Sequence, residues 1–93
     1  MSIEELMKKM KVKYIADLAL KIEELRALVL KKDFLEIESI LHKLKGSGAS
    51  YGLPEVSEFG AKYEQKAKNN SLSDDELNNL VPELEELYKA HAA

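Results

Sequence analysis

Apolar residues recur every three or four positions through most of the chain, and this spacing limits the fold more than any other feature of the sequence. A helix brings such positions onto one face, whereas a half-buried strand would need strict alternation. No segment alternates in that way, and the 93 residues include only four glycines and two prolines. The periodicity therefore predicts an all-α protein in which each helix has one apolar face.

Capping signals divide this pattern into separate helices. Ser2 and Glu5 have the spacing of a capping box, which predicts a short opening helix. A longer helix is expected from Val12 to about residue 32. Asp33 then stands where an N-cap residue belongs, and Gly52 is well placed to end the helix that follows.

Two further helices follow from the same signals. Pro54 suits the first turn of a helix, which two asparagines close at residues 69–70. Ser73 and Glu76 repeat the capping-box spacing and open the last amphipathic helix. Pro82 removes one backbone hydrogen bond within it, so we expect a bend or a restart in the preceding turn.

These helices supply enough apolar positions for one hydrophobic core. Short connections favour antiparallel packing of neighbouring helices. The expected fold is an antiparallel up-down four-helix bundle with a short extra N-terminal helix, in one domain over residues 1–93. The positions expected to be buried are Val12, Ile15, Leu18, Ala19, Ile22, Leu25, Val29, Phe34, Ile37, Leu41, Leu44, Gly48, Tyr51, Val56, Phe59, Tyr63, Ala67, Leu77, Leu80, Val81, Leu84, Leu87 and Tyr88.

Composition excludes several classes of function. The formal net charge of -3 argues against a nucleic-acid-binding protein, which usually needs a concentrated basic surface. The absence of cysteine excludes disulfides and thiolate metal sites. No segment approaches the roughly 20 uninterrupted apolar residues of a membrane helix. We therefore expect a cytoplasmic protein with neither nucleic acid nor membrane as a partner.

The most informative segment contains two glycines where the apolar pattern demands a helix. Gly46 and Gly48 should each cost about 1 kcal/mol relative to alanine in a helix interior. On a helical wheel, His42 points away from the core with Lys45 beside it, while Gly48 falls on the buried side. A sequence that tolerates such glycines usually needs room for the close approach of another group.

The exposed imidazole of His42 suits a nucleophile that enters the active site of another protein. Gly46 and Ala49 leave room beside it, and Lys45 can compensate the charge of phosphoryl oxygens. The competing interpretation is that His42 is simply solvated, as most surface histidines are.

The segment His42–Ser47 reads H-K-L-K-G-S and is followed by Tyr51 and Gly52, which resembles the signature of histidine-containing phosphotransfer domains. The likeness covers most of the chain, because these domains are helical bundles in which a helix started by Asp carries the histidine. Gly48 departs from the alanine that is common in the family, and we expect local softness of the helix there.

The resemblance implies roles for four residues. His42 would be the phosphorylated residue, Lys45 would contact the phosphoryl group, and Gly46 would keep the approach to the ring open. A polar residue on the next helix often bonds the ring in this family, and that position corresponds to Glu64, with Gln65 as its neighbour. An ordinary solvated carboxylate remains the other interpretation of Glu64.

The resemblance also implies a phosphorelay intermediate. His42 would accept a phosphoryl group from the aspartate of a receiver domain and pass it to the aspartate of another, and a hybrid sensor histidine kinase is a candidate source. No cofactor is expected in the chain itself, since the partner receiver would supply Mg²⁺. We expect docking around His42, with apolar contact from Leu35 and Ala49 and with Glu38 at the rim, although Leu35 could instead belong to the core.

Other interpretations stay open at the level of sequence. The chain could bind a receiver without transferring phosphate, or it could be a helix-turn-helix DNA binder with its turn at residues 51–54. The acidic start of the next helix, Glu55 and Glu58, disfavours the second. The glycine spacing matches no nucleotide-binding loop, so we expect no kinase activity with ATP. His91 is predicted to be a solvated residue of the C-terminal helix, and no metal site is expected.

Overall fold

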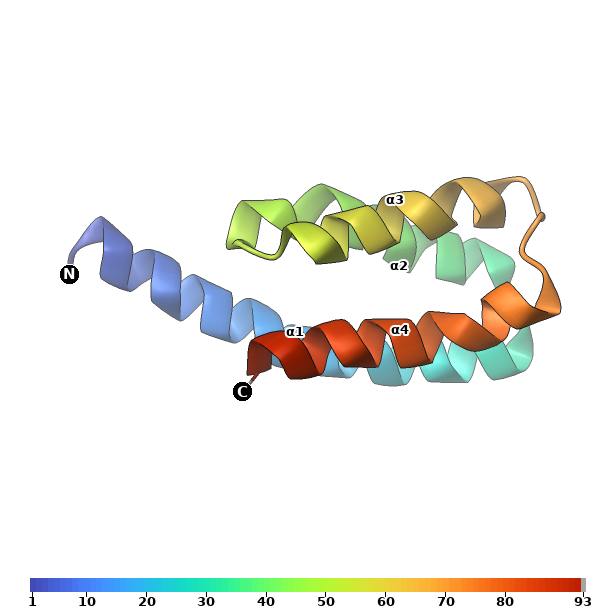
Figure 1. Ribbon diagram of the computed structural model, residues 1–93, viewed down its shortest axis with the longest axis horizontal. Helices are drawn as coiled ribbons and strands as arrows, with labels where there is room; N and C mark the ends of the chain where they lie inside the picture. The colour runs from blue at the N-terminus through green and yellow to red at the C-terminus, as the bar shows by residue number, and fades with distance from the viewer. Residues whose placement is uncertain (93) are drawn as a thin grey trace.

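The computed structural model describes residues 1–92, and four α-helices and one short 3-10 helix lie within this range. They are α1 (Ile3–Lys31), α2 (Phe34–Ser47), η1 (Ala49–Tyr51), α3 (Pro54–Lys68) and α4 (Asp74–Ala92). Each α-helix runs antiparallel to the one before it, with α2 alongside α3 and α1 alongside α4 (Figure 1). The predicted all-α helical bundle is confirmed.

The prediction of a short, separate N-terminal helix is wrong, because its residues form the first turns of α1. Ser2 does cap the helix, since its Oγ accepts a hydrogen bond from the backbone N–H of Glu5 at 3.1 Å. The next residues are mainly Met and Lys, which favour helix, and no glycine or proline interrupts them. α1 therefore extends beyond the bundle as an overhang (Figure 1), and Val12, expected in the core, is exposed.

The bundle packs around one apolar cluster to which all four α-helices contribute. Most expected core positions are buried or packed against this cluster. Ile40 and Leu53 are also buried, although the expected pattern omitted both. Leu53 lies in the connection before α3, where a sequence pattern based on helical spacing has no basis for placing it inside.

α4 continues through Pro82 without a restart. Pro82 itself is exposed, so its ring occupies the outer face of the helix. Val81 and Leu84, on either side of it, are buried in the core. Tertiary packing of both halves stabilises the helix where the proline withdraws one backbone bond.

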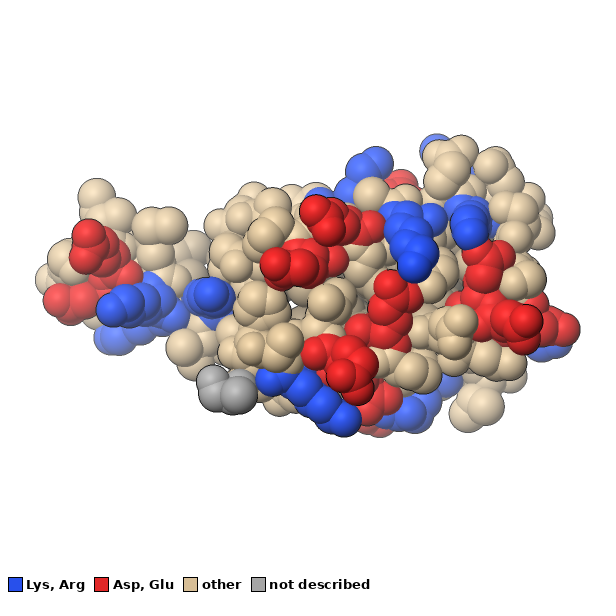
Figure 2. Space-filling model, viewed as in Figure 1, with Lys and Arg blue, Asp and Glu red and all other residues tan. Residues whose placement is uncertain are grey.

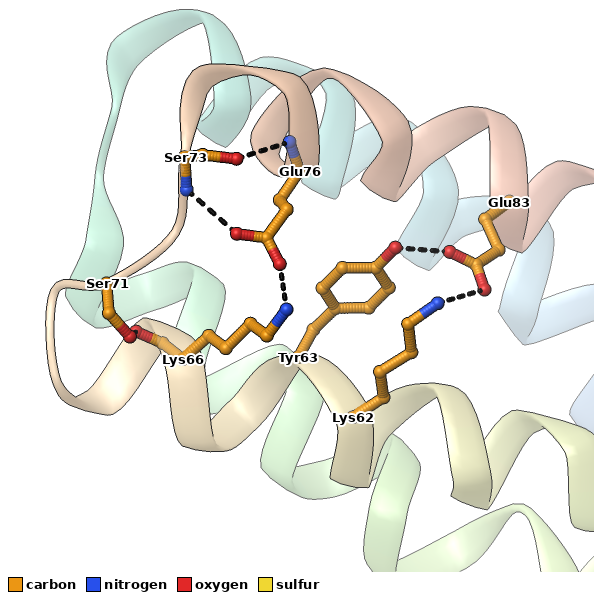
Figure 3. Close-up of polar contacts among 7 residues, drawn as sticks. All are labelled: Lys62, Tyr63, Lys66, Ser71, Ser73, Glu76 and Glu83. Carbon is orange, nitrogen blue, oxygen red and sulfur yellow. Dashed lines mark hydrogen bonds and ion pairs between the residues drawn. The ribbon is translucent and has the colours of Figure 1, made fainter.

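Polar contacts fasten the start of α4 to α3 (Figure 3). The backbone N–H of Ser73 donates to Glu76 Oε1, and the N–H of Glu76 donates to Ser73 Oγ, both at 3.1 Å, which completes the predicted capping box. The other oxygen of Glu76 pairs with Lys66 of α3, and the Tyr63 hydroxyl donates to Glu83. The box therefore ties neighbouring helices together as well as starting one.

The fold bears on two features that the sequence disfavours, a helix-turn-helix unit and a membrane-spanning helix. α2 and α3 lie alongside each other (Figure 1), whereas the helices of a helix-turn-helix unit cross at about 90–120°. Residues 51–54 therefore do not form the turn of a helix-turn-helix unit. Within residues 1–92, none of the helices combines the length and the apolar character that crossing a bilayer requires.

Candidate functional site

His42 lies on the outer face of α2, as the helical wheel predicts. Asp33 caps this helix by accepting a hydrogen bond from the Glu36 N–H at 3.3 Å. The neighbouring Leu41 and Leu44 are buried and hold α2 against the core, which turns the His42 side chain outward with 71% of its surface exposed. A side chain this open is accessible to another macromolecule.

The imidazole is held from one side by Glu64 of α3. Glu64 Oε1 lies 2.9 Å from His42 Nδ1, and only 13% of the Glu64 side chain is exposed. No other hydrogen bond to the His42 ring is present within residues 1–92. The predicted position of Glu64 beside the ring is thus what the structure shows, whereas the neighbouring Gln65 is exposed.

The charge on Glu64 determines which ring nitrogen is free. The hydrogen bond from His42 lowers the pKa of the Glu64 carboxyl, and the positive charges of Lys45 and Lys68 add to this effect against the opposing effect of burial. An ionised carboxylate can only accept, so a neutral His42 must carry its proton on Nδ1. The lone pair of the imidazole then resides on Nε2.

Lys45 stands close to the same carboxylate. Its Nζ lies 3.8 Å from Glu64 Oε2, and about half of the Lys45 side chain is exposed. That oxygen is buried and has no hydrogen-bond partner among residues 1–92. Lys45 is therefore a neighbouring cation whose ammonium group is not committed to a close hydrogen bond, which leaves it available to an anion beside His42.

Gly60 brings the two helices together beneath this site, and sequence reasoning missed it. A Cβ at Gly60 would lie 2.5 Å from the backbone nitrogen of Lys45 and 2.6 Å from the carbonyl oxygen of Leu41. Only a residue without a side chain permits this approach, and Glu64 follows one turn later on the same helix. A signal was present, because Gly60 falls on the buried face of a helix in which glycine is costly.

The two glycines that the sequence singled out have different surroundings. A Cβ at Gly46 would meet no atom within 4 Å, whereas a Cβ at Gly48 would lie 2.6 Å from the backbone nitrogen of Ser57. Gly48 thus has a packing role where α2 approaches α3. The α-helix ends at Ser47 and continues into η1, so the helix geometry changes at the glycine that departs from the family pattern.

An open groove of about 400 Å³ runs beside the ring between α2 and α3. Leu35 lines it with 79% of its surface exposed, so the alternative that Leu35 belongs to the core is wrong. Glu38 also lines the groove, while Ala49 is exposed further along α2 and η1 without lining it. The remaining lining residues are Ser39, His42, Glu64 and Lys68.

His91 differs from the prediction of a solvated residue. Its Nε2 lies 3.0 Å from Glu55 Oε2, and only 22% of its side chain is exposed. This pair joins the end of α4 to the start of α3, which is a structural role. Among residues 1–92, no group of three or more His, Cys, Asp or Glu side chains is arranged to hold a metal ion.

Comparison with known proteins identifies a family. A family model described as the Hpt domain matches residues 9–93. No curated protein and no solved structure matches the chain. The matched range contains every residue of the His42 site and leaves out the first turns of α1.

Proposed function

The chain belongs to the Hpt domain family, and from this we propose that it is a phosphorelay intermediate that accepts and donates phosphoryl groups on His42. The family implies histidine phosphotransfer in phosphorelays, in which Hpt domains interact with receiver domains. The assignment to His42 rests on one observation above all: an exposed imidazole whose Nδ1 is held by Glu64 while Nε2 is left without a partner in the described chain.

The chemistry follows from the state of the ring. Nε2 of the neutral imidazole attacks the phosphorus of an aspartyl phosphate in line, a P–N bond forms, and the P–O bond to the aspartate breaks. The aspartate leaves as a carboxylate and the ring becomes cationic. Glu64, 2.9 Å from Nδ1, stabilises that positive charge and holds the proton in place, so no proton needs to leave the ring during transfer.

Lys45 and Gly46 serve the incoming group in different ways. Phosphoryl transfer depends mainly on alignment and on compensation of charge on the transferred oxygens. Lys45 supplies a partly exposed cation whose Nζ lies 3.8 Å from Glu64 Oε2. A Cβ at Gly46 would meet no atom within 4 Å in the described chain, so the missing side chain serves no internal packing and is explained by the approach of a partner.

The receiver domain supplies the rest of the site. It presents the aspartyl phosphate and its bound Mg²⁺, so the Hpt chain needs no cofactor of its own. Docking uses the face around His42, with Leu35 as the exposed apolar contact and Glu38 at the rim of the groove. Ala49 extends this face beyond Gly46. A transient interface of this kind is modest in area.

The test is phosphoryl transfer from a receiver domain that has been phosphorylated with a small-molecule donor in the presence of Mg²⁺. We expect an acid-labile, base-stable adduct on the wild-type chain, its loss in His42→Ala and its retention in His91→Ala, which is the matched control. His42→Ala should remain folded by circular dichroism because His42 is on the surface. His91→Ala should remain folded too, because it removes a single contact, with Glu55, in the last turn of α4.

The same experiment distinguishes phosphotransfer from the alternative function, which is binding of receivers without transfer. A module that only binds receivers would give no adduct and would bind wild type and His42→Ala equally well. That result, obtained with receivers that are phosphorylated and active toward another Hpt domain, would replace the proposed function. The presence or absence of the adduct on His42 is therefore decisive.

A further inference from the structure

The overhang of α1 exposes an unusual amount of apolar surface. Residues 1–12 include six large apolar side chains, and each is at least 43% exposed. Four of them lie within about 100° of each other around the helix, so they form one stripe. This stripe consists of Ile3, Leu6, Met7 and Met10. A contiguous exposed stripe of this kind is typical of an interaction surface.

Charges on the overhang are segregated along its length. Glu4 and Glu5 occupy the first turn, and Lys8, Lys9 and Lys11 follow nearer the bundle. Figure 2 shows the acidic group at the tip of the overhang and the basic group behind it. The helix dipole accounts for carboxylates in the first turn. It does not account for the lysines, because they lie far from the C-terminal end of α1.

When the overhangs of two copies lie antiparallel, apolar positions of one copy face apolar positions of the other, and acidic positions face basic positions. If two overhangs lie antiparallel and are centred between Leu6 and Met7, Ile3 of one copy comes opposite Met10 of the other. In the same register, the Glu4–Glu5 pair lies along the Lys8–Lys9 pair of the second copy. A parallel pair would instead place like charges together, which is destabilising.

We propose that the α1 overhang is a self-association surface, on which the overhang of a second copy of this chain packs antiparallel to form a two-fold symmetric dimer. The same patch on both copies is then self-complementary, as a two-fold contact requires. The stripe supplies the apolar contact, and the opposite charges of the Glu4–Glu5 and Lys8–Lys9 pairs favour the antiparallel orientation.

The base of the overhang provides a receptor for the second helix. A groove of about 190 Å³ forms where Met7 and Met10 meet Tyr51 and Gly52. Tyr51 is held in place because its ring stacks on Tyr14, with centroids 4.8 Å apart and the planes inclined by 11°. In the antiparallel register, Ile3 of the second copy comes opposite Met10, at the edge of this groove. The groove thus extends the contact beyond two bare helices.

The proposed contact is separate from the phosphotransfer site and small in area. None of the residues that line the overhang groove lines the groove beside His42. Short contacts belong at the low end of interface sizes, so the dimer should be weak and its population should rise with protein concentration.

Sedimentation velocity over a range from micromolar to millimolar concentration tests self-association. We expect the wild-type weight-average sedimentation coefficient to rise with concentration. It should stay at the monomer value for Glu4→Lys/Glu5→Lys and for Lys8→Glu/Lys9→Glu, because each variant carries one sign of charge over residues 4–9, the positions that pair in the antiparallel register. An equimolar mixture of the two variants should associate again, which a folding defect would not permit. Leu20→Lys, at an exposed position within the bundled part of α1, is the matched control.

Disulfide formation tests the relative orientation of the two overhangs, and no native cysteine interferes because the chain has none. On mixing Ile3→Cys with Met10→Cys under mild oxidation, we expect the mixed disulfide to form several-fold faster than either symmetric one, with Leu20→Cys as a slow control. A wild-type chain that stays monomeric at millimolar concentration would overturn the proposal. Faster symmetric disulfides would overturn the antiparallel arrangement, and a monomer whose Met7→Lys variant loses receiver binding would assign the surface to the receiver instead.

Discussion

Glu64 and His42, on neighbouring helices and 22 residues apart in sequence, meet with 2.9 Å between Oε1 and Nδ1. The carboxylate occupies one nitrogen of the ring and leaves the other without a partner in the described chain. The ring is therefore asymmetric before any substrate arrives, and this asymmetry makes the site of modification predictable within a single side chain.

We predict that phosphorylation occurs on Nε2 of His42. Nδ1 donates to Glu64, so its lone pair is not available in the neutral ring. NMR of ¹⁵N-labelled, phosphorylated protein distinguishes the two ring nitrogens by their shifts and by phosphorus coupling. An adduct on Nδ1 would contradict the orientation assigned to Glu64.

Glu64→Ala should slow phosphoryl transfer to His42 by about 10-fold, the lower end of the loss that follows removal of a group that orients a metal-ligating histidine. The ring would lose both its fixed tautomer and the anion that stabilises its cationic form. Rapid-quench measurement of the transfer rate checks this, with Gln65→Ala as the exposed neighbouring control. A rate for Glu64→Ala equal to that of the control would reduce Glu64 to an ordinary surface carboxylate.

Substitutions of Gly46 should raise stability while they impair transfer. A Cβ there meets no atom within 4 Å, and replacing a helical glycine by alanine should stabilise the fold by about 0.5–1 kcal/mol. Gly46→Gln should fold well yet obstruct an incoming receiver, with a larger loss of transfer than Gly46→Ala. Urea unfolding checks the gain in stability, and the transfer assay, run on the same samples, checks the loss of phosphoryl transfer. Unimpaired transfer by Gly46→Gln would show that partners do not approach on this side.

Gly60→Ala should lower the stability of the fold, whereas Gly46→Ala should raise it. Its Cβ would lie 2.5 Å from a backbone atom of Lys45, so α3 must move away from α2. Overpacking of this kind costs typically 1–3 kcal/mol, and the gain in helix propensity offsets about 1 kcal/mol of it. We expect a net destabilisation of up to about 2 kcal/mol by urea unfolding. Gly46→Ala is the matched control, because it makes the same change on the facing helix in open space.

These two glycines also show where sequence reasoning succeeds and where it stops. Periodicity and capping were enough to place His42 on an exposed face, because both are local properties of one helix. The motif then brought Gly46 to attention. The requirement for Gly60 arises only when two helices approach each other, and nothing in the α3 sequence alone states which backbone lies opposite.

The same distinction explains the errors at the two ends of the chain. A capping box predicts where a helix begins but not where it stops, and no breaking residue separates Ser2 from the rest of α1. Val12 follows the apolar spacing of its helix but lies on the part that extends past the bundle. His91 was predicted to be solvated because its partner, Glu55, is 36 residues away in sequence. Long-range neighbours cannot be inferred from helical spacing.

The contribution of Glu76 to stability should depend on pH. Its pKa is lowered chiefly by the hydrogen bond from Lys66, and also by the backbone N–H and hydroxyl of Ser73, against the opposing effect of desolvation. A carboxyl whose pKa is lower in the folded state stabilises the fold above its unfolded pKa, about 4.3, and this contribution is lost as the pH falls through the folded value. Wild type should therefore be more stable than Glu76→Gln near neutral pH, and the difference should shrink below about pH 4. Urea unfolding of both proteins across this range checks the sign, with Asp75→Asn as a control in the same helical turn. A difference that grows as the pH falls would show that the charged Glu76 does not stabilise the junction between α3 and α4.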